Sequence, residues 1–339
     1  MKKFLAVLLA CFVLFTFSAC RSVNSGVTAS TAQTGSTAAA TTAATTAAAE
    51  TTAAETETLA PATEEPTTVY YEPVHINPEV ITGAPGSAAK TYTGYEPLPE
   101  VSFTVIDPEN TRGLSTKANG FGFGLGKNGS QPAESISNQN LFDQYDALAL
   151  DRTSPGKILH LTFDCGYENG YTGKILDVLK EKHVQAAFFC TLSFIKSEPE
   201  LVARMIAEGH IVGNHSTTHP VFPNISRTKM AMEIQNCDNY LRTNFGYSAP
   251  FFRFPEGSYS KDSLDLVQSI GYKSVFWSVA YADWDPANQK GTRFAVETVL
   301  SRLHPGAVIL LHAVSKDNAA ALGEIIDRAR ELGYIFKSL

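Results

Sequence analysis

The chain has 339 residues and a formal net charge of −7 at pH 7, and 18% of its residues are charged. That length can hold one large domain or two domains of average size. An acidic balance without a basic patch argues against nucleic acid as a partner.

The N-terminal twenty residues have the pattern of a secretory signal peptide. Residues 1–20 carry two lysines, then an apolar run too short for a comfortable membrane span, then small residues ending at Cys20. The last four, Phe-Ser-Ala-Cys, resemble a bacterial lipobox, in which the cysteine is lipidated. A cleaved signal with an incidental cysteine is the alternative. We expect a secreted protein at the outer face of the cytoplasmic membrane or in the cell wall, with a lipid on Cys20 as its only membrane contact.

The next segments do not have the composition of a folded core. Residues 21–68 consist mainly of Ala, Thr, Ser, Glu and Pro, which cannot bury enough apolar surface to offset the chain entropy. The density of β-branched threonine argues against a helix, so we predict a disordered tether. Residues 69–114 are rich in Pro, Gly, Thr and Tyr without periodicity, and we interpret them as an extended lead-in.

The remainder, residues 115–339, has the alternating pattern of an α/β domain. Amphipathic helical patterns lie between most of its β-rich runs, and Ser226 and Ser260 are candidate helix N-caps. Such alternation predicts a parallel sheet, long enough to form a closed or nearly closed barrel. The β-rich runs are 158–163, 186–190, 210–214, 251–254, 273–279, 307–312 and 334–338.

Chemically active side chains follow five of these runs. In parallel barrels, sites lie at the carboxyl ends of the strands. Each residue alone has an ordinary interpretation, such as a packed histidine or a turn aspartate, but chance rarely places all of them at successive strand ends. In chain order they are Asp164 and Cys165, His215 and His219, Arg253 and Pro255, Asp283 and Trp284, and His312.

Two residue types among these point to metal or thiol chemistry. His215 and His219 are four apart, so they can point to one side of a helical turn and bind a metal, although this spacing alone is a weak signal. With Cys11 in the signal and Cys20 at the anchor, three cysteines are left in the mature fold. An odd number without a CxxC motif argues against a disulfide framework, although the alternative of a single bond stays open. The three are Cys165, Cys190 and Cys237.

These strings, in this order and spacing, resemble a known enzyme family. TFDCG, HSTTH, RFPEGSY, the Asp-Trp pair and LLH are similar to the five motifs of the polysaccharide deacetylase (NodB-homology, carbohydrate esterase 4) family. The similarity covers residues 115–339. Longer strings such as TFDCGYENGYT and HPGAVILLHAVSKDNAAAL resemble its PdaA-type branch, the delta-lactam-forming muramic acid de-N-acetylases of spore-forming bacteria.

The resemblance implies a distorted (β/α)7 barrel that hydrolyses the N-acetyl group of an amino sugar. It implies a divalent metal on His215 and His219, which polarises the acetyl carbonyl and binds the attacking water. Asp164 would be the general base and His312 the acid that protonates the departing amine. Arg253 would pair with Asp164.

The resemblance also assigns the remaining positions. A backbone N–H of the turn Pro255, Glu256 and Gly257 would stabilise the oxyanion, and Trp284 would contact the substrate. Asp283 would orient either Arg253 or His312, and the resemblance leaves the choice between them open.

Two positions depart from the family pattern. Cys165 stands where the family usually has an aspartate as third metal ligand, and Glu256 stands where it usually has an aromatic residue. A thiolate is a sound ligand for zinc, so Cys165 can be the third ligand of a zinc ion. Alternatively it is a neutral thiol, and His215 and His219 alone hold the metal. Zinc is the expected metal, with cobalt or manganese as alternatives.

Three functions follow from this sequence. The first is a monomeric N-deacetylase of N-acetylmuramic acid that acts on peptidoglycan glycan strands and leads to muramic delta-lactam, as in the spore cortex during sporulation. The second is a deacetylase of N-acetylglucosamine or of another acetylated polymer, such as chitin or xylan. The third is a non-catalytic glycan-binding wall protein. A binding protein has no need of the base and acid retained here.

The tether hypothesis has a direct test. Deleting residues 21–68 together with Cys20 should release soluble enzyme of near-normal activity, because a segment that cannot fold contributes nothing to the site. Turnover of a soluble substrate and the distribution between membrane and supernatant would be measured. An inactive truncated enzyme would show that the segment is part of the folded domain.

Overall fold

The computed structural model describes residues 96–339, which form an α/β domain. The predicted signal peptide, lipidation site and linker, and residues 69–95 of the lead-in, lie outside the described residues. The helices are α1 (Ala133–Phe142), α2 (Thr172–Glu181), α3 (Leu192–Ser197), α4 (Pro199–Ala207), α5 (Arg227–Phe245), α6 (Lys261–Ser269), α7 (Thr292–Arg302) and α8 (Lys316–Glu331), with short 3-10 helices η1 (Asp143–Tyr145), η2 (Phe222–Asn224) and η3 (Pro255–Gly257).

The strands form a parallel sheet that curves into a distorted barrel. Their order is β1-β6-β5-β4-β3-β2-β7, with β8 paired to the start of β2. Isolated bridges from Leu150 to Ala307 and from Val279 to Ile309 link the two ends of the sheet. The strands are β1 (Ala147–Leu148), β2 (Ile158–Cys165), β3 (Ala187–Cys190), β4 (Ile211–Asn214), β5 (Phe251–Phe252), β6 (Lys273–Val275), β7 (Ala307–His312) and β8 (Ile335–Phe336).

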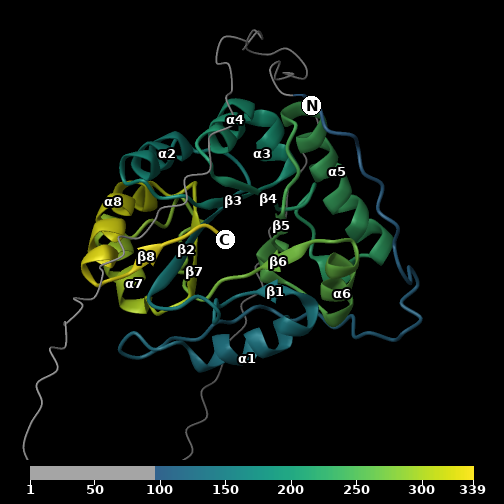
Figure 1. Cartoon of the computed structure of the whole chain (residues 1–339), viewed down its shortest axis with the longest axis horizontal. Coiled ribbons are helices and arrows are strands. Elements are labelled where there is room, and N and C mark those ends of the chain that lie inside the picture. Colours follow the sequence, from purple (N-terminus) through teal and green to yellow (C-terminus); the bar gives the residue numbers. More distant parts are fainter. Residues whose placement is uncertain (1–95) are drawn as a thin grey trace, which may run out of the picture. The chain divides into compact units, whose positions relative to one another are not determined.

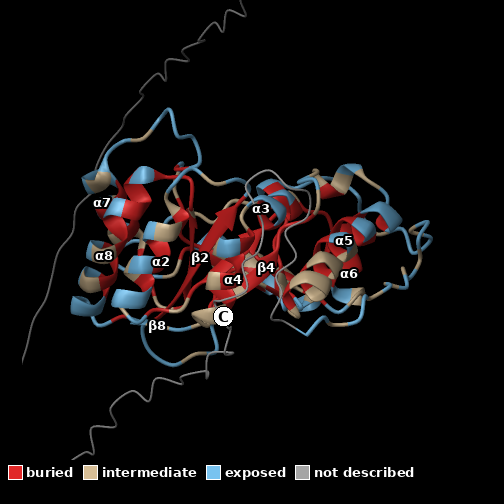
Figure 2. Ribbon diagram, turned by 90° about the horizontal axis from the view of Figure 1, so that it is seen from above, coloured by how far each residue is buried: buried red, intermediate tan, exposed pale blue. Residues whose placement is uncertain are grey.

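The helices surround the strands, which lie in the middle of the domain (Figure 1). All eight residues of β2 are buried, as expected for a parallel strand covered on both faces. The larger core lies between the strands and the helices and contains Phe163 and Cys165 of β2. A smaller core, which includes Phe189 and Val308, lies on the other face of the sheet. Figure 2 shows the strands as a buried layer with exposed residues on the outer helices.

The predicted alternation of strands and helices is confirmed, with corrections at the boundaries. The run 273–279 is a strand only over Lys273–Val275, and β1 was not predicted. Both predicted N-caps are present, because the side chains of Ser226 and Ser260 accept hydrogen bonds from Lys229 N–H and Ser263 N–H. The architecture agrees with the predicted distorted (β/α)7 barrel.

The described part of the lead-in crosses the outer surface of α5 without regular secondary structure. Leu98 N–H donates to the carbonyl of Arg242, and the side-chain amide of Asn239 both accepts from Val101 N–H and donates to Val101 O. The segment is therefore fixed to the barrel by hydrogen bonds. Within residues 96–339, no helix is long and apolar enough to span a membrane.

Candidate active site

The predicted residues converge at the carboxyl ends of the strands. Asp164 near the end of β2 is in register with His312 at the end of β7. Arg253 directly follows β5, and its N–H donates to the carbonyl of Asn214, which ends β4. His215 follows Asn214 in the chain. Four strands thus bring the candidate base, acid, arginine and first histidine to one edge of the barrel.

A buried ion pair lies at the centre of this edge. Arg253 Nη1 is 2.7 Å from Asp164 Oδ1, and the arginine side chain is 0% exposed. Every nitrogen of the guanidinium has a partner. Nε donates to Val275 O, and Nη2 donates to Thr162 Oγ1 and Phe276 O. The guanidinium also lies 4.0 Å from the ring centroid of Phe189, a cation–π contact.

This pairing fixes the protonation state of Asp164. Burial alone would raise the pKa of the carboxyl, but the positive charge of Arg253, with contributions from His215 and His312, brings the pKa below its usual value. Asp164 is therefore ionised at neutral pH. Its second oxygen, Oδ2, lies 3.6 Å from His215 Nε2.

His215 is held in one orientation as a neutral imidazole. Its Nδ1 lies 2.9 Å from the carbonyl of Arg253, so Nδ1 carries the proton and Nε2 keeps a free lone pair. Burial lowers the pKa of His215 to about 4. A neutral imidazole with one nitrogen fixed by a carbonyl is the form that ligates metal.

The loop between His215 and His219 is strained, and it is not a helical turn. Ser216 has a φ of 72° and His219 a φ of 57°, both in the left-handed region that residues other than glycine seldom adopt. The expectation of a helical turn is therefore wrong. The two imidazole rings nevertheless meet, with centroids 4.9 Å apart.

Two residues that the sequence did not single out hold this loop. Asn214 Oδ1 accepts from Ser216 N–H, and the Glu233 carboxylate accepts from the N–H groups of Thr217 and Thr218. Asn214 stands directly before the motif and so carried a local signal. Glu233 lies on α5, and nothing in the neighbouring sequence indicated it.

The candidate acid forms a second charged pair at this edge. His312 Nδ1 lies 2.7 Å from Asp283 Oδ1, and His312 N–H donates to Asp283 Oδ2. Asp283 thus lies against His312 rather than Arg253. Burial lowers the pKa of His312, but the hydrogen bond and charge of Asp283 outweigh it, and the pKa is raised above its usual value.

Asn318 completes this pair, and sequence reasoning missed it. The Asn318 side chain, fully buried at the start of α8, donates to Asp283 Oδ2 at 2.5 Å and to the carbonyl of His312. Its Oδ1 accepts from the hydroxyl of Tyr281 at 2.5 Å. With both oxygens of Asp283 hydrogen-bonded, the carboxylate cannot rotate away from the imidazole.

The turn predicted to bind the oxyanion has one free donor. Within η3, Gly257 N–H donates to Phe254 O, and Ser258 N–H donates to Pro255 O. Pro255 has no N–H. The N–H of Glu256 is therefore the one donor of this turn that lacks a backbone acceptor among residues 96–339. Glu256 adopts a φ of 56° and its side chain is exposed.

Close packing explains the glycine in this turn. A Cβ on Gly257 would lie 2.7 Å from the Trp277 ring, so no larger residue fits. Trp284, predicted to contact substrate, is 57% exposed, and its ring centroid lies 6.0 Å from that of His312. It therefore presents an aromatic surface beside the candidate acid.

The structure does not bring Cys165 to the histidines. Successive strand residues face opposite sides of a sheet, so Cys165 points away from Asp164 into the core between strands and helices. Its side chain is 0% exposed, beside Cys190, and burial raises the pKa of the thiol well above its usual value. Among the described residues, no group of three or more His, Cys, Asp or Glu side chains is arranged to hold a metal ion. The placement favours the neutral-thiol alternative.

Comparison with known proteins agrees with this geometry. The family model "Polysaccharide deacetylase" matches residues 151–275. The peptidoglycan-N-acetylmuramic acid deacetylase PdaA of Bacillus subtilis is 41% identical over 220 residues, which are 65% of this chain and 83% of that protein. The chain belongs to the polysaccharide deacetylase family.

Further comparisons extend this result. The solved structure of Bacillus subtilis PdaA, a family 4 carbohydrate esterase, superposes with a TM-score of 0.63 and covers 66% of this chain and 96% of that one, at 40% identity. An uncharacterised 30.6 kDa protein of Geobacillus stearothermophilus is 46% identical over 62% of this chain and 80% of its own. A chitooligosaccharide deacetylase of Sinorhizobium fredii is 32% identical, over 53% of this chain and 89% of its own length. As a member of this family, the protein is a hydrolase that deacetylates amino sugars.

The position of Cys165 generates a test of its role. Replacing Cys165 with Ser should leave zinc affinity unchanged, because the thiol faces the core, and should cost roughly 1–3 kcal/mol of stability, because a hydroxyl is buried there. His219→Ala, on the exposed loop, should weaken zinc binding severely. Metal titration and thermal unfolding would be measured on both variants. A severe loss of zinc affinity in Cys165→Ser would restore the thiolate as a ligand.

Proposed function

We propose that the protein removes the acetyl group from N-acetylmuramic acid in peptidoglycan. The observation that carries this proposal is the pairing of an ionised, buried Asp164 with an opposing His312 whose pKa is raised. The two groups are in register on neighbouring strands, and their pKa values are shifted in the directions that suit a base and an acid. The similarity to PdaA of Bacillus subtilis, named for muramic acid, supports this choice of substrate.

His215 and His219 are the residues that would hold a divalent metal. Two imidazoles suit zinc, with cobalt or manganese as alternatives, and His215 is neutral and oriented for ligation. When bound, the metal polarises the acetyl carbonyl and lowers the pKa of water. Cys165 is not a ligand in this proposal, because its side chain faces the core.

Asp164 acts as the general base. Arg253 occupies its Oδ1, so the free Oδ2 is the oxygen that takes a proton from the attacking water. The same contact keeps the carboxylate ionised until that step. The Glu256 N–H, which has no backbone acceptor among residues 96–339, would donate to the negative charge that develops on the acetyl oxygen.

His312 acts as the general acid. Its Nδ1 proton is held by Asp283, so Nε2 is the atom that donates a proton to the departing amine. The C–N bond then breaks, and acetate is the second product. Asn318 keeps Asp283 in place for this role. Trp284, exposed beside His312, would stack against the sugar.

The finer parts of the proposal follow from the chemistry of muramic acid. The freed amine lies on the same sugar as the lactyl carboxyl, so the two can condense to a cyclic amide with loss of water. The product would be the muramic delta-lactam of spore cortex, made during sporulation. The enzyme would act as a monomer outside the cytoplasmic membrane, attached through a lipid on Cys20.

A second candidate function is supported by another relative. The similarity to the chitooligosaccharide deacetylase of Sinorhizobium fredii supports an N-acetylglucosamine polymer as the substrate of this chain. The third hypothesis, a glycan-binding protein without activity, gains no support from a site in which both the base and the acid have aligned partners.

Muropeptide mass spectrometry tests the choice of substrate. Purified enzyme incubated with amidase-treated peptidoglycan should remove an acetyl group from muramic acid, followed by loss of one water. His312→Ala and Asp164→Asn should each lower turnover by about 10²–10⁴-fold. Asp164→Asn leaves Arg253 buried without a counter-charge, at a cost of about 3–5 kcal/mol, so its folding must be verified. Acetyl loss from glucosamine alone would favour the second function.

The dependence of activity on pH tests the assigned acid. His312 must be protonated to act, so kcat/KM should fall as pH rises through its raised pKa. Asp283→Asn removes the charge that raises this pKa, and should shift the alkaline limb to lower pH. Asp317→Asn is the matched control, since Asp317 accepts from Gly291 N–H and does not touch His312. An alkaline limb that stays in place in Asp283→Asn would contradict the role of His312.

A further inference from the structure

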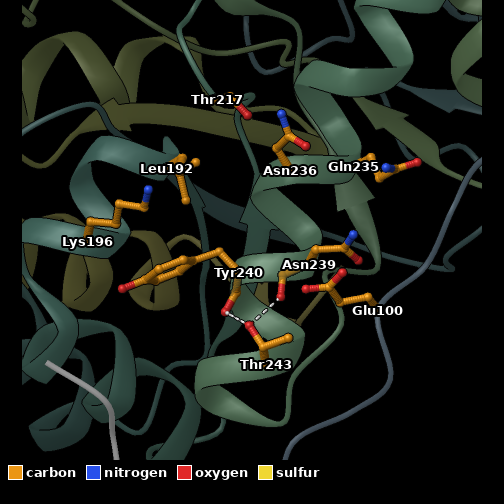
Figure 3. A pocket seen from close by; sticks show the side chains of 9 residues that line it. All are labelled: Glu100, Leu192, Lys196, Thr217, Gln235, Asn236, Asn239, Tyr240 and Thr243. Atoms are coloured by element: carbon orange, nitrogen blue, oxygen red, sulfur yellow. Dashed lines mark hydrogen bonds between the residues drawn. The ribbon is translucent and has the colours of Figure 1, made fainter. Parts of the chain in front are cut away.

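A polar pocket of about 550 Å³ lies between α3, α5 and the lead-in, outside the strand ends that form the site. Figure 3 shows its lining, with Lys196 and Leu192 from α3 facing Asn236 and Tyr240 from α5. Glu100 of the lead-in borders the far end. Nothing in the proposed mechanism uses this pocket.

The pocket begins at the loop that carries the two histidines. Thr217, between His215 and His219, is part of its lining. Thr217 N–H donates to the carboxylate of Glu233 on α5, so the loop and the helix are connected. Tyr240 lies seven residues further along α5, about 10 Å at 1.5 Å per residue. A polymer bound at the histidines could therefore continue into this pocket.

Some polar groups in the lining already have structural partners. The Gln235 side chain accepts from Phe103 N–H, and Asn239 is bonded to Val101. These amides hold the lead-in against α5. They form one wall of the pocket and are not free to bind a ligand with the same atoms.

Other groups in the lining have no such partner. Lys196 is exposed, its ammonium lies 5.2 Å from the centroid of the Tyr240 ring, and it forms no salt bridge within residues 96–339. The amide of Asn236 and the hydroxyl of Tyr240 also make no side-chain hydrogen bond among the described residues. A cation, an amide and an amphipathic ring are thus left available together.

We propose that this pocket is a subsite for a distal muramic acid of the same glycan strand. Lys196 pairs with its lactyl carboxylate, while Asn236 and Tyr240 bind its acetamido and hydroxyl groups. This inference rests on the proposed function, because it takes the substrate to be a strand in which a carboxylate-bearing sugar recurs. The pocket then selects long strands over short fragments, since a short fragment cannot fill both places.

The direct test is binding of defined glycans to the full chain. The His312→Gln background slows turnover, so affinity can be measured by calorimetry. The probes are peptide-free glycan strands of several disaccharide repeats, and a chitin oligosaccharide of equal length without carboxylates. Lys196→Ala and Asn236→Ala are compared with Lys174→Ala, a matched control. Lys174 is an exposed lysine whose ammonium lies 5.3 Å from the ring centroid of Tyr171, away from the pocket.

Each substitution should have its own pattern. Lys196→Ala should lower the affinity for muramic strands about tenfold, which corresponds to the loss of one charged hydrogen bond. The affinity for the chitin oligosaccharide should fall much less. Asn236→Ala should weaken both ligands, because both carry acetamido and hydroxyl groups. Lys174→Ala should bind like the background protein. Both changed residues are exposed, and unaltered thermal midpoints would verify folding.

Two results would overturn the subsite. One is unchanged strand affinity in both Lys196→Ala and Asn236→Ala, and the other is failure of the background protein to bind strands at all. Acetyl release from the peptide-free glycan strands by the wild-type enzyme is measured separately and reports on the proposed function alone. A wild-type enzyme that releases no acetyl group from these strands, while its pocket variants still lose strand affinity, would refute the function and leave strand binding in the pocket standing.

Discussion

The buried ion pair between Arg253 and Asp164 is the interaction on which the rest of the site depends. Removing a guanidinium from water costs several kcal/mol, which the fold offsets only by supplying an acceptor for each of its nitrogens. Those acceptors lie on Thr162 and Asp164 of β2, on Val275 at the end of β6 and on Phe276 directly after it. The arginine therefore requires the strand ends to meet in one arrangement, and it contributes geometry more than stability.

The same residue organises the histidine side of the site. The carbonyl of Arg253 accepts the proton of His215 Nδ1, and its N–H donates to the carbonyl of Asn214. Asn214 in turn holds the strained loop through Ser216 N–H. On the opposite side, Asp283 and Asn318 fix His312 independently of the arginine. The base and the acid are thus positioned by separate hydrogen-bond networks, and the charges at this edge lower the pKa of Asp164 and raise that of His312.

The sequence predicted the strand ends better than the contacts between them. Asp164, Arg253 and His312 follow apolar runs, and a parallel barrel brings such positions to one edge. Asn318 and Glu233 act across the fold from helices, where no local pattern indicates a partner. The strand Ala147–Leu148 has two residues, too few for periodicity to show. Cys165 was assigned from a family position, but strand alternation turns its side chain to the other face of the sheet.

The ionisation of Asp164 is the most direct test of this account. Carbon NMR of protein labelled at the aspartate carboxyl carbons, assigned with Asp164→Asn, would follow this group from neutral pH down to the limit of folding. The account predicts that the Asp164 resonance titrates with a midpoint below pH 3.8, the value of an unperturbed aspartate, because Arg253 stabilises the anion. A titration midpoint above 3.8 would show that burial outweighs the ion pair, and would contradict the proposed base.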